Sequence, residues 1–313
     1  MLSTMKRTWS SLLRTSAKLL SREVATSMRG RGWEIPVYPF SFREFLRHQD
    51  APIPEEPERL SAKKAATLDH HFARYLVEGG FPEAQGLSIS ERRRLLQGYV
   101  DVALLRDVIE RHEIRNPTAL RWLTRRLLSA PAGLFSVTKF AADLKSQGVA
   151  ASRDSLYEFL DHLEDAYLVH MVSVATESEK RRQVKPRKVY PMDPALIPLF
   201  DRSGKSNLGH ALEVCVFIEL QRRGAEVTYV HTPQGFEVDF LARYPDGTEE
   251  LIQVCADLSA PETFAREMRA LQDAGPLFPN AGPRALTAES RLPMPETPKG
   301  VTIRPAWEWM LAP

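Results

Sequence analysis

The sequence predicts a multidomain protein of mixed α/β class. Its 313 residues are enough for two or three domains that each have a hydrophobic core. Apolar residues recur at helical spacing over residues 63–130, whereas short alternating runs typical of strands dominate after residue 226. Hydrophobic content is 43%, charged content is 26% and the net charge is +2, so no overall field would draw the chain onto nucleic acid.

Cysteine usage and hydropathy bear on the compartment. The chain has only Cys215 and Cys255, which are too few for a disulfide framework and favour a reducing cytoplasm. No apolar run approaches the roughly 20 residues that a membrane helix needs. We therefore expect a cytoplasmic protein without a membrane partner.

Proline and glycine positions divide the first half of the chain. Residues 1–48 form a first segment, in which Ser41 and Glu44 have the spacing of a helix capping box. Residues 49–62 contain three prolines and predict a linker. Residues 63–130 predict a helical region that breaks at Gly79-Gly80 and restarts at Asn116-Pro117.

Residues 131–193 predict a helix, a turn, a second helix and a two-stranded ribbon, which is the winged-helix plan. The second helix should not read bases, because its five carboxylates outnumber Arg153 and would face phosphates. The ribbon tip is basic and could grip phosphate without sequence preference; a solvated loop is the alternative. The candidate nucleic-acid-binding residues of this wing are Lys180, Arg181, Arg182, Lys185, Arg187 and Lys188.

Residues 194–313 predict a helix followed by strands and further helices, and two of the strands resemble the core of a PD-(D/E)XK nuclease. That family places an Asp on one strand and Glu-x-Lys on the next, because carboxylates hold a divalent cation and the lysine stabilises developing charge. This chain has Asp239 on the first strand, but Gln253 and Cys255 at the Glu and Lys positions. Glu213 on the preceding helix completes the set of degenerate catalytic positions, and with Asp239 it could bind a metal weakly. Glu237 is expected on the opposite face of its strand.

Several segments, taken in order, resemble a family of prokaryotic AAA-type ATPases. The matching pieces are residues 16–31, 38–45, 75–82, 155–160, 163–168 and 189–193. The resemblance implies a P-loop module, a winged helix and a restriction-nuclease-like domain. It also implies that Arg29 or Arg31 serves as an arginine finger for the nucleotide of a neighbouring subunit.

The P-loop itself is missing, because no G-x-x-x-x-G-K-[ST] occurs in the 313 residues. Residues 1–48 are therefore expected to be a remnant of the ATPase module in a truncated homologue. No cofactor is expected for this chain alone, and ATP with Mg²⁺ would require a P-loop from a missing N-terminus or from a partner.

The sequence thus favours an AAA-family ATP-binding protein homologue without its own ATPase or nuclease activity, acting as a nucleic-acid- or protein-interaction module. Two alternatives stay open. One is a metal-dependent DNA nuclease with a divergent active site. The other is a subunit that lends its arginine finger to a P-loop ATPase partner. Whether the chain is an enzyme stays undecided.

Overall fold

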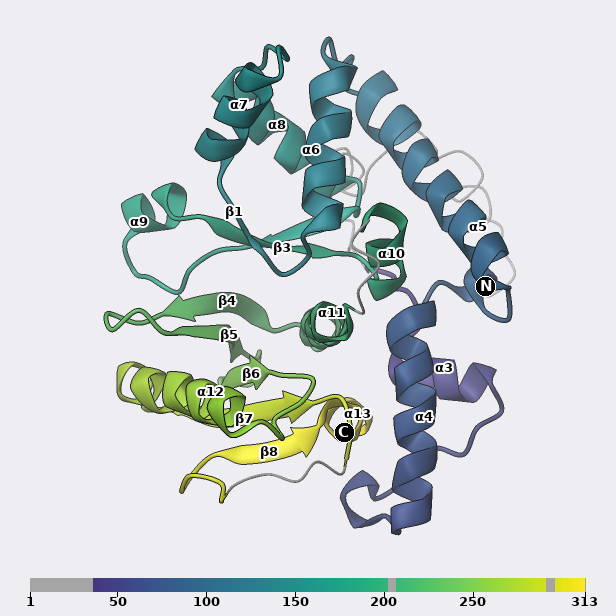
Figure 1. The fold of residues 1–313 in the computed structure, drawn as a ribbon, viewed down its shortest axis with the longest axis vertical. Helices are drawn as coiled ribbons and strands as arrows, with labels where there is room; N and C mark the ends of the chain where they lie inside the picture. Colours follow the sequence, from purple (N-terminus) through teal and green to yellow (C-terminus); the bar gives the residue numbers. More distant parts are fainter. Residues whose placement is uncertain (1–35, 202–206, 291–295, 313) are drawn as a thin grey trace, which may run out of the picture.

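The computed structural model describes residues 36–201, 207–290 and 296–312. Most of the predicted ATPase remnant, including the candidate finger residues Arg29 and Arg31, lies outside these ranges. The described part is a mixed α/β structure with two sheets. In Figure 1, helices α5 to α8 gather at one end and the five-stranded sheet lies at the other, with α11 seen end-on between them.

Two N-terminal helices pack against the C-terminal part of the chain. Helix α3 (Phe42–His48) begins with the predicted capping box of Ser41 and Glu44, and α4 (Ala62–Glu78) follows a short 3-10 turn, η1 (Pro57–Arg59). The rings of Phe42 and Phe72 meet edge to face, 5.1 Å apart. Both helices share one hydrophobic core with helices near the C-terminus, so the segments on the two sides of the predicted linker belong to the same core.

The middle of the chain is helical around a small antiparallel sheet, whose strand order is β1-β3-β2. The expected helix, turn, helix and ribbon are all present, but the ribbon tip contains a short helix, α9, in place of a plain loop. The elements are η2 (Pro82–Ala84), α5 (Ile89–Val102), a π-helical turn η3 (Ala103–Glu110), α6 (Pro117–Ser129), β1 (Leu134–Phe135), α7 (Val137–Ser146), α8 (Arg153–Asp165), β2 (Val169–Val172), α9 (Glu179–Val184), β3 (Arg187–Pro191), η4 (Pro194–Leu196) and α10 (Ile197–Phe200).

The C-terminal part contains a five-stranded sheet of order β4-β5-β6-β7-β8, antiparallel from β4 to β6 and parallel from β6 to β8. Helix α12 packs on one face, while α11 and α13 pack on the other. Nine of the fifteen residues of α11 are buried, all of them between Ala211 and Leu220, as expected for a helix segment that is covered on all sides. The elements are α11 (Leu208–Arg222), β4 (Glu226–His231), β5 (Glu237–Arg243), β6 (Glu249–Val254), α12 (Pro261–Ala274), η5 (Gly275–Leu277), β7 (Ala281–Thr287), β8 (Thr302–Pro305) and α13 (Ala306–Leu311).

Three distant segments meet at the buried carboxylate of Asp193. Its Oδ2 accepts the Gly80 N–H at 2.7 Å, and its Oδ1 accepts the Ala195 N–H at 2.8 Å. The Phe40 N–H donates to the Gly80 carbonyl at 2.7 Å, and the Tyr75 hydroxyl donates to the Phe40 carbonyl at 2.7 Å. Burial raises the pKa of Asp193 to about 7, although the two N–H groups oppose this shift.

Strand β3 lies between the two halves and is buried on both faces. Val189 points into the core of the middle helices, whereas Tyr190 and Met192 point into the core shared with the C-terminal sheet. The chain after β2 also runs beside β4, where the Ala175 N–H donates to the Tyr229 carbonyl at 2.7 Å. Within the described ranges, no helix combines the length and apolarity needed to cross a bilayer.

Candidate functional site

An irregularity in β5 aims Asp239 at the α11 side of the sheet. Thr228 pairs with Leu241, but Val230 pairs with Val238, so two residues of β5 lie opposite the single residue Tyr229. Such a β-bulge breaks the simple alternation of faces and redirects the side chains next to it. Accordingly Val238 and Leu241 both contribute to the α12 side of the sheet.

Four charged side chains meet there, and we refer to Lys188, Glu213, Glu237 and Asp239 as the Lys188 cluster. The Lys188 ammonium lies 2.7 Å from Asp239 Oδ1, 2.9 Å from Glu237 Oε1 and 3.1 Å from Glu213 Oε1. Lys188 comes from β3, Glu213 from α11 and the other two from β5. The tertiary fold therefore assembles this centre from three elements that are distant in the sequence.

This geometry corrects two predictions from the sequence. Lys188 is only 2% exposed and its ammonium is bonded to carboxylates, so it offers no surface to nucleic acid and is not a wing residue. Glu237 does not face away from Asp239, because residues two apart on a strand share a face and both contact the same amine. An amine does lie beside Asp239, although it does not come from the position of Cys255.

Burial and mutual repulsion govern the protonation of the Lys188 cluster. Burial and, second, the Asp239 charge raise the pKa of Glu213 to about 8, against the opposing effects of Lys188 and Tyr190. Burial alone would lower the pKa of Lys188, but Asp239, Glu213 and Glu237 together raise it well above its usual value. Burial therefore favours the protonated form of Glu213, whereas the surrounding carboxylates favour the charged form of Lys188.

Further hydrogen bonds within the protein hold the carboxylates of the site. The Tyr190 hydroxyl donates to Glu213 Oε1 at 2.8 Å, and the Val254 N–H donates to Asp239 Oδ2 at 2.9 Å. Gln253 accepts the Asp239 N–H at 3.3 Å and donates to Glu267 at 2.7 Å. Gln253 thus acts as a bridge from β6 to α12.

Cys255 does not join the cluster. It follows the end of β6, is half-buried, and its thiol donates to the Asp257 carbonyl at 3.2 Å. Burial raises the pKa of this thiol, which disfavours the reactive thiolate. Both its hydrogen bond and its raised pKa favour an unreactive thiol.

The capacity of this site for a metal follows from its donors. Glu213, Glu237 and Asp239 are the oxygen ligands that a hard cation would require, but each of them contacts the Lys188 ammonium. Among the residues that the structure describes, no group of three or more His, Cys, Asp or Glu has the arrangement of a metal site. The ammonium occupies the place that a cation would take.

The other wing residues are at the surface. Lys180, Arg181, Arg182 and Lys185 are exposed and Arg187 is half-buried. A groove of 890 Å³ runs between α9 and β4, and we refer to it as the wing groove. Its charged and polar lining includes Thr176, Glu177, Arg181, Arg182, Lys185, His231 and Arg243.

Sequence reasoning missed three parts of this centre: the role of Lys188, the hydroxyl of Tyr190 and the carboxylate of Glu267. Lys188 shares its strand face with Tyr190 and Met192, which are buried, and this alternation is a signal that its side chain points inward. Glu267 lies in the apolar stripe of α12 with Phe264 and Met268 and is 7% exposed. A charged residue inside an apolar stripe indicates a buried partner.

Comparison with known proteins gives a family without an assigned activity. A family profile described as "Domain of unknown function (DUF8612)" matches residues 69–205. The chain is 31% identical over 307 residues to the "Uncharacterized protein MJ1544" of Methanocaldococcus jannaschii, a match that covers 95% of this chain and 67% of that protein. An "Uncharacterized protein" of Haemophilus influenzae is 29% identical over 248 residues, covering 79% of this chain and 58% of its own length. No solved structure matches the chain.

Proposed function

The chain belongs to the family of the Methanocaldococcus jannaschii protein MJ1544, and we propose that it is a cytoplasmic homologue of AAA-type ATP-binding proteins. In this proposal it acts as a nucleic-acid interaction module. It hydrolyses neither nucleotide nor nucleic acid itself. Its resemblance to that ATPase family supports the proposal. Three of the segments that carry the resemblance, residues 38–45, 75–82 and 189–193, hydrogen-bond to one another around Asp193.

The Lys188 cluster supports the proposed absence of nuclease activity, because it has no room for a metal ion. The Lys188 ammonium sits where a divalent cation would have to bind, and its charge is already balanced by carboxylates. Replacing the ammonium would leave a buried lysine unpaired, which costs several kcal/mol. The Glu position of the nuclease motif is occupied by Gln253, whose amide is engaged with Glu267 and with the Asp239 backbone.

A cleavage assay tests this proposal. Supercoiled plasmid is incubated with the purified chain and Mg²⁺ or Mn²⁺, in parallel with the Asp239→Ala variant. We expect no cleavage above the level of the variant with either metal. Metal-dependent nicking that disappears in Asp239→Ala would refute the proposal, and turnover of ATP by the isolated chain would do the same.

One observation favours a second candidate, a metal-dependent nuclease with a displaced lysine. The Lys188 ammonium lies 2.7 Å from Asp239 and 3.1 Å from Glu213, so the amine that a PD-(D/E)XK nuclease needs beside its carboxylates could come from β3. In that mechanism Lys188 would stabilise the charge that develops on the phosphate. Cleavage that is lost in both Asp239→Ala and Lys188→Met, but kept in Cys255→Ala, would establish this candidate.

The wing groove supports the nucleic-acid part of the proposal. Arg181 and Arg182 line it from α9, Lys185 lines it from the position after that helix, and Arg243 lines it from β5. Arg243 is neutralised by Glu249 at 2.7 Å and Arg182 has a long contact to Glu179 at 3.8 Å, so Arg181 and Lys185 supply most of the positive charge that faces Glu177 in the groove. Contacts of this kind hold phosphates without reading sequence.

Charge reversal tests the role of the wing groove. The double variant Arg181→Glu, Arg182→Glu should weaken DNA retention about equally for different sequences and reduce the dependence of binding on salt. The matched control is Arg93→Glu, Arg94→Glu, because these two arginines are exposed on α5, away from the groove. Equal retention by the two double variants would remove the wing groove from the proposal.

A further inference from the structure

Helix α6 has two sharply different faces. Its inner residues Leu120, Leu123, Leu127 and Leu128 are almost fully buried in the core of the middle helices. Its outer face is exposed and carries Thr118, Arg121, Trp122, Arg125 and Arg126. The inner stripe alone follows the helical period of a core-facing helix, so packing of the core does not require Trp122.

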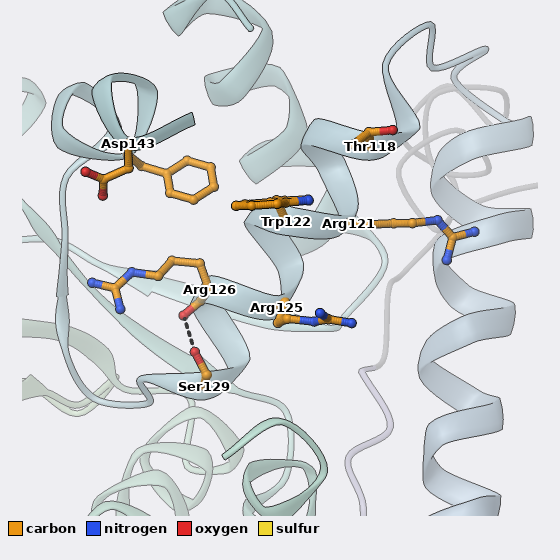
Figure 2. Close-up of a pocket in the computed structure, with 8 residues that line it drawn as sticks. Thr118, Arg121, Trp122, Arg125, Arg126, Ser129 and Asp143 are labelled. Atoms are coloured by element: carbon orange, nitrogen blue, oxygen red, sulfur yellow. Dashed lines mark hydrogen bonds between the residues drawn. The ribbon is translucent and has the colours of Figure 1, made fainter. Parts of the chain in front are cut away.

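A groove of 730 Å³ lies along this outer face, and we refer to it as the α6 groove. It is lined by Thr118, Arg121, Trp122, Arg125, Arg126, Ser129, Phe140 and Asp143. Figure 2 shows that Trp122 lies near the centre of these side chains, with Arg126 extending to the side of Asp143 and with Arg121 and Arg125 extending to the other side. Trp122 is 45% exposed, which is unusual for so large an apolar side chain.

The charges of the α6 groove are uncompensated. Three guanidinium groups line it against one carboxylate, that of Asp143. In the described part of the chain, none of these arginines has a carboxylate within ion-pair distance, whereas Arg92 of α5 and Arg74 of α4 do. A cationic groove around an exposed indole ring has the chemistry that binds unstacked bases and their phosphates.

We infer that the α6 groove binds single-stranded nucleic acid, with one base stacked on Trp122 and the flanking phosphates contacted by Arg126 on one side and by Arg121 and Arg125 on the other. This contact is separate from the wing groove and shares no residue with it.

The arrangement favours a single strand over the other anionic ligands. A duplex keeps its bases stacked on one another, so it would leave the face of Trp122 without a partner. An acidic peptide could pair with the arginines but would gain little from an exposed indole plane. Cations on both sides of the ring fit a chain in which phosphates precede and follow every base.

Fluorescence anisotropy with a labelled oligothymidylate of about 20 nucleotides tests the inference, since a single binding fold covers about 4–16 nucleotides. Trp122→Ala should weaken binding about 5- to 150-fold, which is the range that alanine substitution of stacking aromatics produces. In the wild type, a base stacked on Trp122 should also quench its fluorescence. Trp122→Phe should keep most of the affinity but lose this quenching. Leu105→Ala is the matched control, because Leu105 is likewise 45% exposed, and it should bind like the wild type.

The arginines give an independent readout. Replacing Arg121, Arg125 and Arg126 by Gln should make the slope of log K against log salt shallower by about 2, at about 0.7 per phosphate of a single strand. Equal affinity of Trp122→Ala and Leu105→Ala would overturn the inference. Polyglutamate that competes fully with the oligonucleotide, with no effect of Trp122→Ala, would also overturn it and would indicate an acidic protein partner.

The wing variant separates the inference from the proposed function. Loss of binding in Arg181→Glu, Arg182→Glu with unchanged binding in Trp122→Ala would refute the α6 groove alone. Loss in Trp122→Ala with unchanged binding in the wing variant would support the α6 groove and refute the wing. Full binding by both variants would refute both.

Discussion

The substitution Lys188→Met provides the most direct test of the Lys188 cluster. It removes the ammonium that contacts three carboxylates at 2.7, 2.9 and 3.1 Å, two of them buried, while keeping a side chain of similar length and volume. Breaking a buried ion pair by removing one partner typically costs about 3–5 kcal/mol, because the other charge stays buried without compensation. The equilibrium constant for unfolding should therefore rise by about 10²- to 10⁴-fold.

The measurement is urea unfolding followed by tryptophan fluorescence. Trp307 and Trp309 are buried in the same core as Tyr190, so their emission reports on this part of the molecule. The control is Lys185→Met, a lysine three positions earlier that is exposed. Surface substitutions of this kind usually change the free energy of unfolding by less than about 0.5 kcal/mol.

The pH dependence of Lys188→Met sharpens the test. Without the ammonium, the carboxylates hold protons more tightly in the folded state, so the folded variant loses stability as pH rises. The gap between wild type and variant should therefore widen with increasing pH. If Lys188→Met and Lys185→Met were equally stable, Lys188 would be a surface residue and the cluster would not exist in solution.

Three further predictions concern buried groups near this centre. Burial raises the pKa of Glu213 to about 8 from an ordinary 4.5, so the folded state binds more protons between these values and its stability falls as pH rises through them. Glu213→Gln should reduce this slope by up to about 1.4 kcal/mol per pH unit in urea titrations at several pH values. An unchanged slope would contradict the assignment. Tyr190→Phe keeps the ring stacked 4.5 Å from Phe217 but removes the donor to Glu213. It should lower the free energy of unfolding by about 1 kcal/mol in the same assay. An unchanged free energy would mean that the hydrogen bond from the Tyr190 hydroxyl is absent. Gly79→Ala should lower the thermal midpoint of the protein more than Gly86→Ala. Both glycines have positive φ (70° and 73°), but only at Gly79 would a Cβ lie 1.9 Å from Asp193 Oδ1. Equal thermal midpoints would argue against the close packing of Gly79 on Asp193.

Much of the secondary structure follows from local patterns in the chain. The capping box at Ser41, the buried stripe of Leu156, Phe159, Leu160 and Leu163, and the alternating runs of β4 to β6 all fall where the sequence predicts them. These features depend on contacts between residues a few positions apart, or on one face of one element, and such periodicity is legible in a single sequence. Helix α9 escaped prediction because its six residues carry no apolar stripe.

By itself the sequence determined the mixed α/β class and pointed to Glu213 and Asp239 as residues of one centre. Only the tertiary structure decided which cation they meet, since Lys188 reaches them from a strand 51 positions before Asp239 and belongs to the other sheet. The pattern of a strand shows which of its side chains point inward, but not what lies opposite them. That depends on how β3, α11 and the bulged β5 pack together, and in this protein the packing makes Lys188, which the sequence suggested for nucleic-acid binding, the buried partner of three carboxylates.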